Sequence, residues 1–228
     1  MQSLKSLWVR LIRFGFRLLY NELAWTYDLV SWVFSLGEWR RWQRAGLQFL
    51  NGRKLLEIGH GPGHLLLQMA QDGKLVVGLD LSPYMGRQAR RRLRKNGQTA
   101  DLTQAMVQGL PFVSQSFESV LSTFPTDYVV DPDTLAEVHR VLVENGRFVI
   151  VPEGHLTTGG LLQTVIDWLF RITGQRSEAF EVNEEGFWPS QTIWQPLRER
   201  LETAGFQVRI EQVSFKRSAA TVIVATKS

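Results

Sequence analysis

The sequence contains no cysteine, and no uninterrupted apolar stretch in it approaches the ~18–20 residues that span a bilayer. The missing cysteine excludes disulfide scaffolds, zinc fingers, thiolate catalysis and cysteine-ligated iron–sulfur clusters, and it fits a reducing compartment. The apolar segment 4–20 is interrupted by four basic residues and no small-residue cleavage site follows it, so it does not predict a secretory peptide. Together these absences favour a cytoplasmic protein.

The residues that are present have the composition of a folded globule. The 228 residues are 44% hydrophobic and 21% charged, unlike a disordered chain. Five of the eight tryptophans lie in the first 42 residues, and the first 53 residues hold eight Lys or Arg against three Asp or Glu. That segment has a charge of +5 in a chain whose total is +4, which leaves −1 for the remainder. The chain therefore has a basic, aromatic head on a nearly neutral body.

The hydrophobic pattern changes from helical in the head to alternating in the body. Apolar residues between positions 4 and 19 recur at spacings of three, four and seven, which predicts helices in a cap over residues 1–52. From residue 53, short apolar strands alternate with helical segments, and this alternation predicts a parallel sheet with helices on both faces. The predicted strands of this part are 54–58, 75–80, 102–107, 117–122 and 147–151. The predicted helices are 65–70, 83–96 and 132–143.

The alternation breaks after residue 151. Residues 152–191 contain a glycine pair, an apolar helix at 161–172 and a polar stretch, and they are predicted to form a lid-like helical insertion. A helix at 192–204 and two strands at 206–215 and 221–226 follow, the strands close enough in sequence for an antiparallel hairpin. Residues 53–228 are thus expected to form one α/β domain.

The strongest chemical signal is the glycine-rich segment 57–63, which follows the first predicted strand. Its glycines let the backbone turn sharply and approach a ligand, and the next helix offers free N–H groups. Asp80 ends the second strand, 17 residues beyond Gly63, where a carboxylate can accept both ribose hydroxyls of a nucleoside. This pattern indicates an adenosine-containing cofactor.

The loop does not fit a dinucleotide. The NAD and FAD fingerprint G-x-G-x-x-G would need its third glycine at His64 or at Leu66, depending on which glycine begins it. Glu57 would also place a negative charge near a pyrophosphate, whereas a sulfonium cofactor with a free amino group is cationic there. No Gly-Lys-Ser/Thr of a Walker loop follows. An NAD-type oxidoreductase is therefore disfavoured.

Four segments in order resemble the class I S-adenosylmethionine-dependent methyltransferases. Residues 55–64 resemble motif I, and residues 77–85, with Leu79-Asp80-Leu81-Ser82, resemble the second motif. Gly109-Leu110-Pro111-Phe112 with residues 116–120 is similar to the "LPF…FD-V" segment of the type-11 subgroup, and residues 135–149 to its "EhRVLkPGGr" segment. The resemblance implies a Rossmann-like sheet of seven strands in the order 3-2-1-4-5-7-6, the last strand antiparallel, and S-adenosylmethionine as the cofactor.

The resemblance also implies a set of site residues. Glu57 would hold the amino end of the cofactor, Asp80 the ribose hydroxyls, and Leu81, Met106 and Val107 would flank adenine. Two departures stand out, because Met106 replaces a usual acid and Glu118 replaces the usual aspartate of "FD". The predicted cofactor-binding residues of the body are Glu57, Gly59, His60, Gly61, Gly63, Asp80, Leu81, Met85, Met106, Val107, Thr123 and Phe124.

The head has a resemblance of its own. Residues 20–29, which contain Ala24-Trp25-Thr26-Tyr27-Asp28, are similar to the N-terminal region of ubiquinone/menaquinone-biosynthesis-type methyltransferases. In those proteins the "A-x-x-YD" element closes over the cofactor, so Tyr27 joins the predicted site. The same resemblance implies a bulky, apolar acceptor.

Three further features leave alternatives open. His155, just past the fifth strand, is a candidate general base toward an acceptor or a plain loop residue. His60 and His64 have no carboxylate partner at ligand spacing, so no metal site is predicted. Residues 1–20 either cover the core or lie on a membrane surface, which suits a basic and aromatic helix. Nucleic acid is not an expected partner, because the body is neutral and contains no recognised module.

The sequence thus predicts methyl transfer from S-adenosylmethionine to a small or lipophilic acceptor, at an O, N or C nucleophile. Direct in-line displacement is expected, because the methyl group is already activated and catalysis then rests on alignment and exclusion of water. The missing cysteine excludes a thiol relay. The alternatives are a non-catalytic lipid- or membrane-associated protein on the same scaffold and, less favoured, the NAD-type oxidoreductase.

Overall fold

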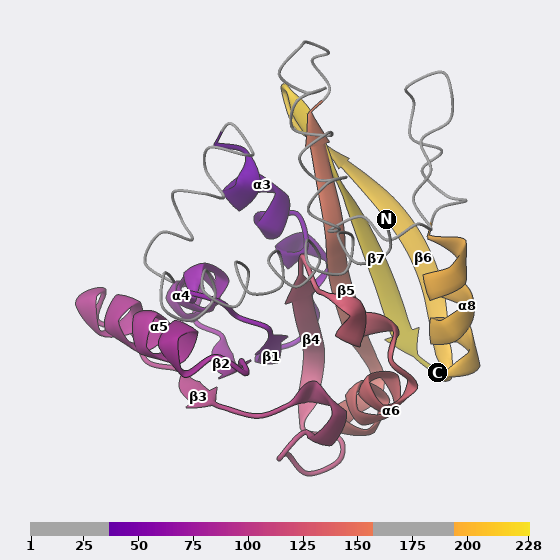
Figure 1. The fold of residues 1–228 in the computed structure, drawn as a ribbon, viewed down its shortest axis with the longest axis horizontal. Helices are drawn as coiled ribbons and strands as arrows, with labels where there is room; N and C mark the ends of the chain where they lie inside the picture. The colour runs from indigo at the N-terminus through magenta and orange to yellow at the C-terminus, as the bar shows by residue number, and fades with distance from the viewer. Residues whose placement is uncertain (1–36, 157–193) are drawn as a thin grey trace, which may run out of the picture.

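The structure is a computed structural model that describes residues 37–156 and 194–228 (Figure 1). Several predictions fall outside these residues: the helices of the cap before residue 37, Tyr27, and the lid helix at 161–172. None of the helices within the described ranges combines the length and apolar character that crossing a membrane requires.

One sheet of seven strands organises the molecule (Figure 1). Its spatial order is β3-β2-β1-β4-β5-β7-β6, with β1 to β5 parallel and β7 antiparallel to both β5 and β6. The predicted strand order and the antiparallel last strand are therefore confirmed. The strands are β1 Lys54–Ile58, β2 Leu75–Leu79, β3 Asp101–Thr103, β4 Phe117–Thr123, β5 Leu142–Leu156, β6 Phe206–Ser214 and β7 Ser218–Lys227.

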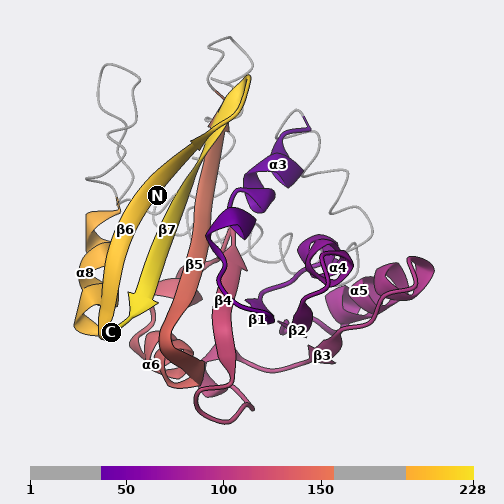
Figure 2. The same ribbon diagram turned by 180° about the vertical axis from the view of Figure 1, so that it is seen from behind.

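Helices cover both faces of the sheet, as the alternating pattern predicts. Helices α3, α4 and α5 share one hydrophobic cluster with the sheet, and α6 and α8 share the other (Figures 1 and 2). Two helices begin as their sequences indicate, because the side chains of Ser82 and Asp131 accept backbone N–H groups and proline follows each. The helices are α3 Trp39–Arg44, α4 His64–Gln71, α5 Pro83–Lys95, α6 Pro132–Val141 and α8 Gln195–Thr203.

The central strands are apolar on both sides because both sides are covered. Along β5, Phe148 and Ile150 belong to the cluster under α6 and α8, while Val149 and Val151 belong to the cluster under α3, α4 and α5. All four side chains are 0% exposed. A continuous apolar run is the expected sequence of a strand buried on two faces.

Strand β5 is longer than predicted. It continues five residues beyond Val151 and pairs with β7 as far as Leu156 opposite Ser218. Residues 152–156 were predicted to begin the insertion, and this is corrected: they are strand. The pattern missed them because Pro152, Glu153 and Gly154 are poor strand formers, and pairing with β7 is what holds this segment as strand. Strand β3, by contrast, is shorter than the predicted strand 102–107. It ends at Thr103, and Val107 begins a short 3-10 helix, η3 Val107–Gly109.

Candidate cofactor and acceptor site

The glycine loop (residues 59–63) joins β1 to α4 at the carboxyl edge of the sheet. The Gly59 N–H donates to the Leu79 carbonyl at 2.7 Å, and the Gly61 N–H donates to Asp80 Oδ2 at 2.8 Å. Gly59 and Gly63 have φ of 68° and 77°, which favours glycine. A Cβ on Gly63 would lie 2.7 Å from the Ala89 Cβ of α5. The backbone N–H groups of the loop thus tie it to the end of β2, and Gly63 lets it pack closely against α5.

Glu57 lies at the end of β1 beneath this loop, with only 2% of its surface exposed. A backbone hydrogen bond from Leu66 reaches its carboxylate, but Oε2 has no partner among the described residues. Burial raises the pKa of Glu57 well above its usual value, and the nearby Asp80 carboxylate raises that pKa further. A buried acid with an open oxygen beside a second acid is suited to a cation.

Asp80 is positioned by backbone groups on both sides. Its Oδ2 accepts from Gly61 and its Oδ1 accepts from the Ser82 N–H, each at 2.8 Å. Each carboxylate oxygen has a second lone pair, so both can still accept a ribose hydroxyl. A hollow of about 220 Å³ lies beside Asp80, and Arg87, Arg90 and Gln104 also line it. The structure therefore brings Glu57 and Asp80 to one place, as the sequence predicts.

The residues predicted to flank adenine divide into exposed and buried members. Leu81 and Met106 are 63% and 59% exposed, although both are large apolar side chains. Val107 is 8% exposed and belongs to the core, so its backbone rather than its side chain is available. Met85 is 1% exposed in the first turn of α5, where its side chain points inward and offers no surface to a ligand.

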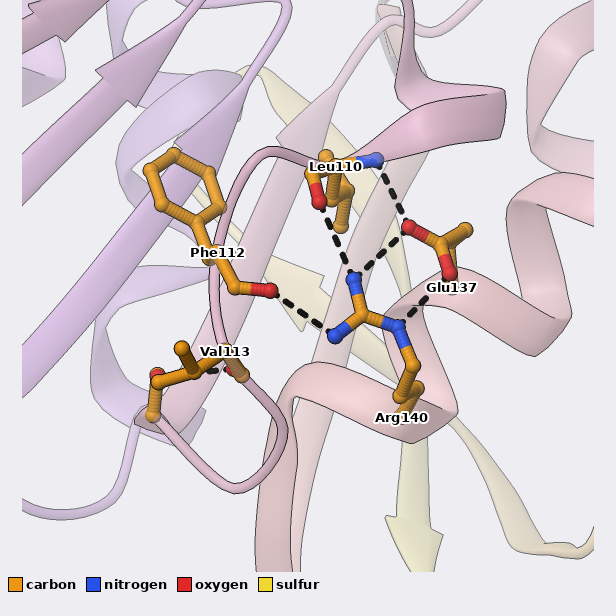
Figure 3. A network of polar contacts seen from close by, with 6 residues as sticks. Leu110, Phe112, Val113, Glu137 and Arg140 are labelled. Atoms are coloured by element: carbon orange, nitrogen blue, oxygen red, sulfur yellow. Dashed lines mark hydrogen bonds and ion pairs between the residues drawn. The ribbon is translucent and has the colours of Figure 1, made fainter.

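Figure 3 shows how α6 holds the chain that follows Val107. Arg140 pairs with Glu137 at 2.7 Å and donates to the carbonyls of Leu110, at 3.0 Å, and Phe112, at 2.8 Å. Glu137 in turn accepts the Leu110 N–H at 2.7 Å. The hydrogen bond from Arg140 is the main cause of the lowered pKa of Glu137. Two of the segments that carry the family resemblance are thus bonded to each other.

Glu118 has a role away from the site. Its carboxylate accepts the N–H groups of Arg53, at 2.6 Å, and Lys54, at 2.7 Å. These two backbone hydrogen bonds lower the pKa of Glu118. Because Glu118 lies near the amino end of β4, these hydrogen bonds hold the start of β1 at the edge of the sheet opposite the glycine loop. Glutamate in place of aspartate there leaves the cofactor residues untouched.

Aromatic side chains gather where β4 ends. Phe124, with φ of 49°, donates its N–H to the Val151 carbonyl at 2.7 Å. Its ring stacks on Trp39 of α3 at 3.8 Å between centroids and lies 6.4 Å from the ring of Trp42. The neighbouring Thr123 hydroxyl accepts from the Gln43 amide at 3.5 Å. Trp39, Trp42 and Phe124 form an aromatic wall that joins α3 to the predicted Thr123–Phe124 position.

His155 lies farther along β5 than the other site candidates. It pairs with Ala219 of β7, and its Nδ1 is buried without a hydrogen-bond partner among the described residues. Burial lowers the pKa of His155, so the imidazole is neutral near pH 7. Val151 pairs with Thr123 at the end of β4, and four residues at about 3.3 Å each place His155 roughly 13 Å beyond that end. An acceptor that contacts His155 must extend along β5.

The His60 side chain forms a hydrogen bond within the glycine loop. Its Nδ1 lies 2.7 Å from the Gly61 carbonyl, and because a carbonyl only accepts, Nδ1 carries the proton. The ring is 5% exposed, and burial lowers the pKa of His60. In the described part of the chain, no three His, Cys, Asp or Glu side chains lie together as metal ligands would.

Tyr128 is a site residue that the sequence reasoning missed. Its hydroxyl is 2.8 Å from the Ser122 hydroxyl, and it also lies 2.8 Å from the place a Cβ on Gly59 would occupy. Tyr128 belongs to a short 3-10 helix, η4 Asp127–Val130, that turns back over the glycine loop. No motif marks this residue, and only the pairing of β1 with β4 brings it there.

The residues present fit S-adenosylmethionine. The open oxygen of Glu57 suits a cationic amino group, the Asp80 carboxylate suits a ribose diol, and the exposed Leu81 and Met106 suit the faces of a base. None of these groups requires a pyrophosphate or a metal ion. The same features give no support to a dinucleotide.

Comparisons with known proteins agree with this site. Residues 55–146 match the Methyltransferase domain family. A demethylmenaquinone methyltransferase of Streptomyces avermitilis is 30% identical over 201 residues, which cover 82% of this chain and 84% of that protein. One from Thermus thermophilus is 28% identical over 227 residues, 90% of this chain and 98% of that protein.

The fold is shared with solved structures as well. The crystal structure of a SAM-dependent methyltransferase from Methanosarcina mazei superposes with a TM-score of 0.55, at 21% identity, and covers 79% of this chain and 95% of its own. That likeness shows the seven-stranded fold. Together with the sequence relatives and the cofactor residues, it leads to one conclusion: the chain belongs to the class I S-adenosylmethionine-dependent methyltransferases, enzymes that take S-adenosylmethionine as their cofactor.

Proposed function

We propose that this methyltransferase methylates a ring carbon of a lipophilic, quinone-type acceptor. The observation that carries the proposal is the aromatic wall of Trp39, Trp42 and Phe124 beside the end of β4. A flat, apolar ring system packs well against such side chains. The names of the relatives, which are demethylmenaquinone methyltransferases, support the same acceptor class.

The geometry supports a role for each of these residues. S-adenosylmethionine, when bound, supplies a methyl group activated by a sulfonium. The Glu57 carboxylate pairs with the cationic amino group, and Asp80 accepts the ribose hydroxyls, so both fix the direction of the methyl. The aromatic wall holds the acceptor ring and excludes water, and alignment of the two reacting atoms provides most of the rate increase.

Methylation of a ring carbon leaves one proton to be removed from the acceptor. We propose that His155, whose buried Nδ1 has no partner among the described residues, accepts that proton from the end of an acceptor that extends along β5 beyond the aromatic wall. Its lowered pKa keeps the imidazole neutral and able to accept. For His155→Gln we expect kcat to fall by about 10²-fold or more with the Kd of S-adenosylhomocysteine unchanged. A change confined to KM would instead make His155 an acceptor-binding residue.

The proposal is tested by binding and by turnover. Calorimetry should show S-adenosylhomocysteine binding that weakens at least tenfold in Asp80→Ala, because about 1.5–3 kcal/mol is lost with each charge-assisted hydrogen bond. Asp72→Ala, which removes an exposed carboxylate that accepts a hydrogen bond from Gln68 at the end of α4, serves as the control. Turnover is then measured with a short-chain demethylnaphthoquinol, with product identified by mass spectrometry.

The outcomes separate the alternatives. Carbon-methylated product supports the proposal, and methylation at oxygen, or of polar amines only, overturns the acceptor class. Binding of the sulfur nucleotide without turnover of any acceptor would favour a non-catalytic lipid-associated protein on this scaffold. Tight binding of NAD in place of S-adenosylhomocysteine would point to the oxidoreductase alternative.

A further inference from the structure

The two helical layers of the molecule differ sharply in charge. Helices α3, α4 and α5, which share one face of the sheet, contain nine Lys or Arg and no Asp or Glu. Helices α6 and α8 on the other face contain three basic and four acidic residues. Helix α5 carries six of the nine cations within a body whose net charge is −1, so the net charge of the body conceals this part of the asymmetry.

Most of these cations are exposed to solvent. Arg40, Arg44, Arg91, Arg94 and Lys95 are exposed, and none of them forms an ion pair within residues 37–156 and 194–228. We call this set the basic face. Two other arginines are engaged within the protein, since Arg41 pairs with Glu38 at 2.7 Å and Arg92 donates to the Pro62 carbonyl.

A hollow on the basic face has the chemistry of an anion subsite. It measures about 140 Å³ and lies between α3 and α4. Its wall contains no acid; it offers the guanidinium groups of Arg40 and Arg44, the ring of His64, glutamine amides and the apolar edges of two leucines. Guanidinium groups bind phosphate oxygens through paired hydrogen bonds, and the leucines suit the glycerol and upper acyl part of a lipid.

Helix α3 connects the basic face to the acceptor side of the catalytic site. On one side it presents Trp39 and Trp42 to Phe124 at the end of β4. On its other side Arg40 and Arg44 are exposed. A surface bound by Arg40 and Arg44 would therefore lie next to the aromatic wall, within one helix diameter of it.

We infer that the basic face docks on the surface of a bilayer containing anionic lipids. Each basic residue near such a surface contributes about 1 kcal/mol to binding, and the residues need no fixed spacing relative to the lipid headgroups. The uncharged α4 between the two basic helices, with leucines and glutamines, suits a lipid surface better than a duplex, whose phosphates would demand a continuous basic track. The inference rests on the proposed function in one respect, namely that a lipophilic acceptor resides in the bilayer.

The test compares two variants of the full chain with equal loss of charge. Flotation is measured at 150 mM salt with phosphatidylcholine vesicles, and with vesicles in which about 30% of the lipid is phosphatidylglycerol. The first variant neutralises the basic face through Arg40→Gln, Arg91→Gln and Arg94→Gln. The control removes the same charge from α8 and from the amino end of β1, away from the basic face, through Arg53→Gln, Arg198→Gln and Arg200→Gln.

We expect the wild type and the control to float with the anionic vesicles and the basic-face variant to partition at least tenfold less. Equal partitioning of the two variants would overturn the inference, because any membrane contact would then lie outside the basic face. Binding of duplex DNA with no vesicle binding would overturn it in favour of nucleic acid.

Calorimetry with S-adenosylhomocysteine separates this inference from the proposed function. None of the three substituted arginines of the basic face belongs to the cofactor site, so the variant should bind the nucleotide like the wild type. Vesicle binding lost with nucleotide binding intact is the expected pattern. Wild-type protein that binds vesicles but neither nucleotide nor acceptor would defeat the proposed function and leave the docking surface standing.

Discussion

The carboxyl group of Glu57 is buried in the free protein with one oxygen unpartnered and a second acid nearby. Burial first and Asp80 second raise its pKa, so its ionised form is the costly one until a cation arrives. A cationic amino group favours the carboxylate. Binding of S-adenosylhomocysteine should therefore release a proton, and its affinity should fall as the pH falls through the raised pKa of Glu57.

Glu57→Gln tests this coupling. We expect the affinity for S-adenosylhomocysteine to fall about tenfold or more at pH 8, because a charge-assisted hydrogen bond contributes about 1.5–3 kcal/mol. The pH dependence of affinity should flatten in the variant. Calorimetry at pH 5–8 in two buffers of different ionisation enthalpy measures both the affinity and the proton. An identical pH profile in the variant would show that Glu57 does not carry the coupling.

The substitution of Glu57 that weakens ligand binding should make the folded chain more stable. A carboxyl group whose pKa is higher in the folded chain than its unfolded value of about 4.3 makes folding less favourable as the pH rises between the two. Glu57→Gln should therefore raise the melting temperature at pH 8 and leave it nearly unchanged at pH 4. Glu199→Gln on the exposed side of α8 is the control, and it should change neither.

At the scale of elements, the contact between α3 and β5 depends on the absence of a side chain. A Cβ on Gly154 would lie 2.2 Å from Cδ2 of Trp42, so the indole and α3 would have to shift. We expect Gly154→Ala to lower the free energy of unfolding by about 1–3 kcal/mol, the usual range for overpacking. Urea denaturation monitored by tryptophan fluorescence measures this change.

A glycine in α5 supplies the matched control. A Cβ on Gly86 would meet nothing within 4 Å, and the residue lies inside a helix. Gly86→Ala should therefore stabilise the protein by about 0.5–1 kcal/mol through helix propensity. The two substitutions add the same methyl group, so opposite signs would assign the effect to the space beside Trp42. Equal effects would mean that α3 does not rest on β5 as described.

The same contact shows what the sequence could predict. The helix starts at Ser82 and Asp131 depend on neighbours within a few residues, so local pattern was sufficient for them. The glycine loop and Asp80 meet across 19 residues, but each follows a strand in a recognisable motif, and that motif was sufficient to pair them. The extension of β5 through His155 depends on pairing with β7, more than sixty residues away. In the sequence Trp39 looks like an ordinary apolar helix residue, and only the structure shows that its ring stacks on Phe124. Contacts between distant segments are set by topology, which local periodicity does not encode.

At the scale of the whole molecule, the proposed cofactor residues come from opposite halves of the sheet. The glycine loop follows β1 and Asp80 follows β2, while Thr123 ends β4 and Tyr128 follows it. Strand β1 lies between β2 and β4, so the chain reverses direction of winding there. Ligands of open α/β sheets bind at such a switch point. A cofactor bound there contacts elements that otherwise meet only through β1.

A ligand that bridges the two halves should stabilise the fold as one unit. At 100 times its Kd, S-adenosylhomocysteine adds about 2.7 kcal/mol to the free energy of unfolding. For a chain of this size, each added kcal/mol raises the melting temperature by about 2–4 °C, so the ligand should raise it by about 5–10 °C. Differential scanning calorimetry should show a single transition that moves as a whole. Asp80→Ala at the same ligand concentration should show a rise smaller by about 1.4 kcal/mol for each tenfold loss of affinity. Two transitions, of which only one responds to the ligand, would mean that the halves unfold independently and that the site does not couple them.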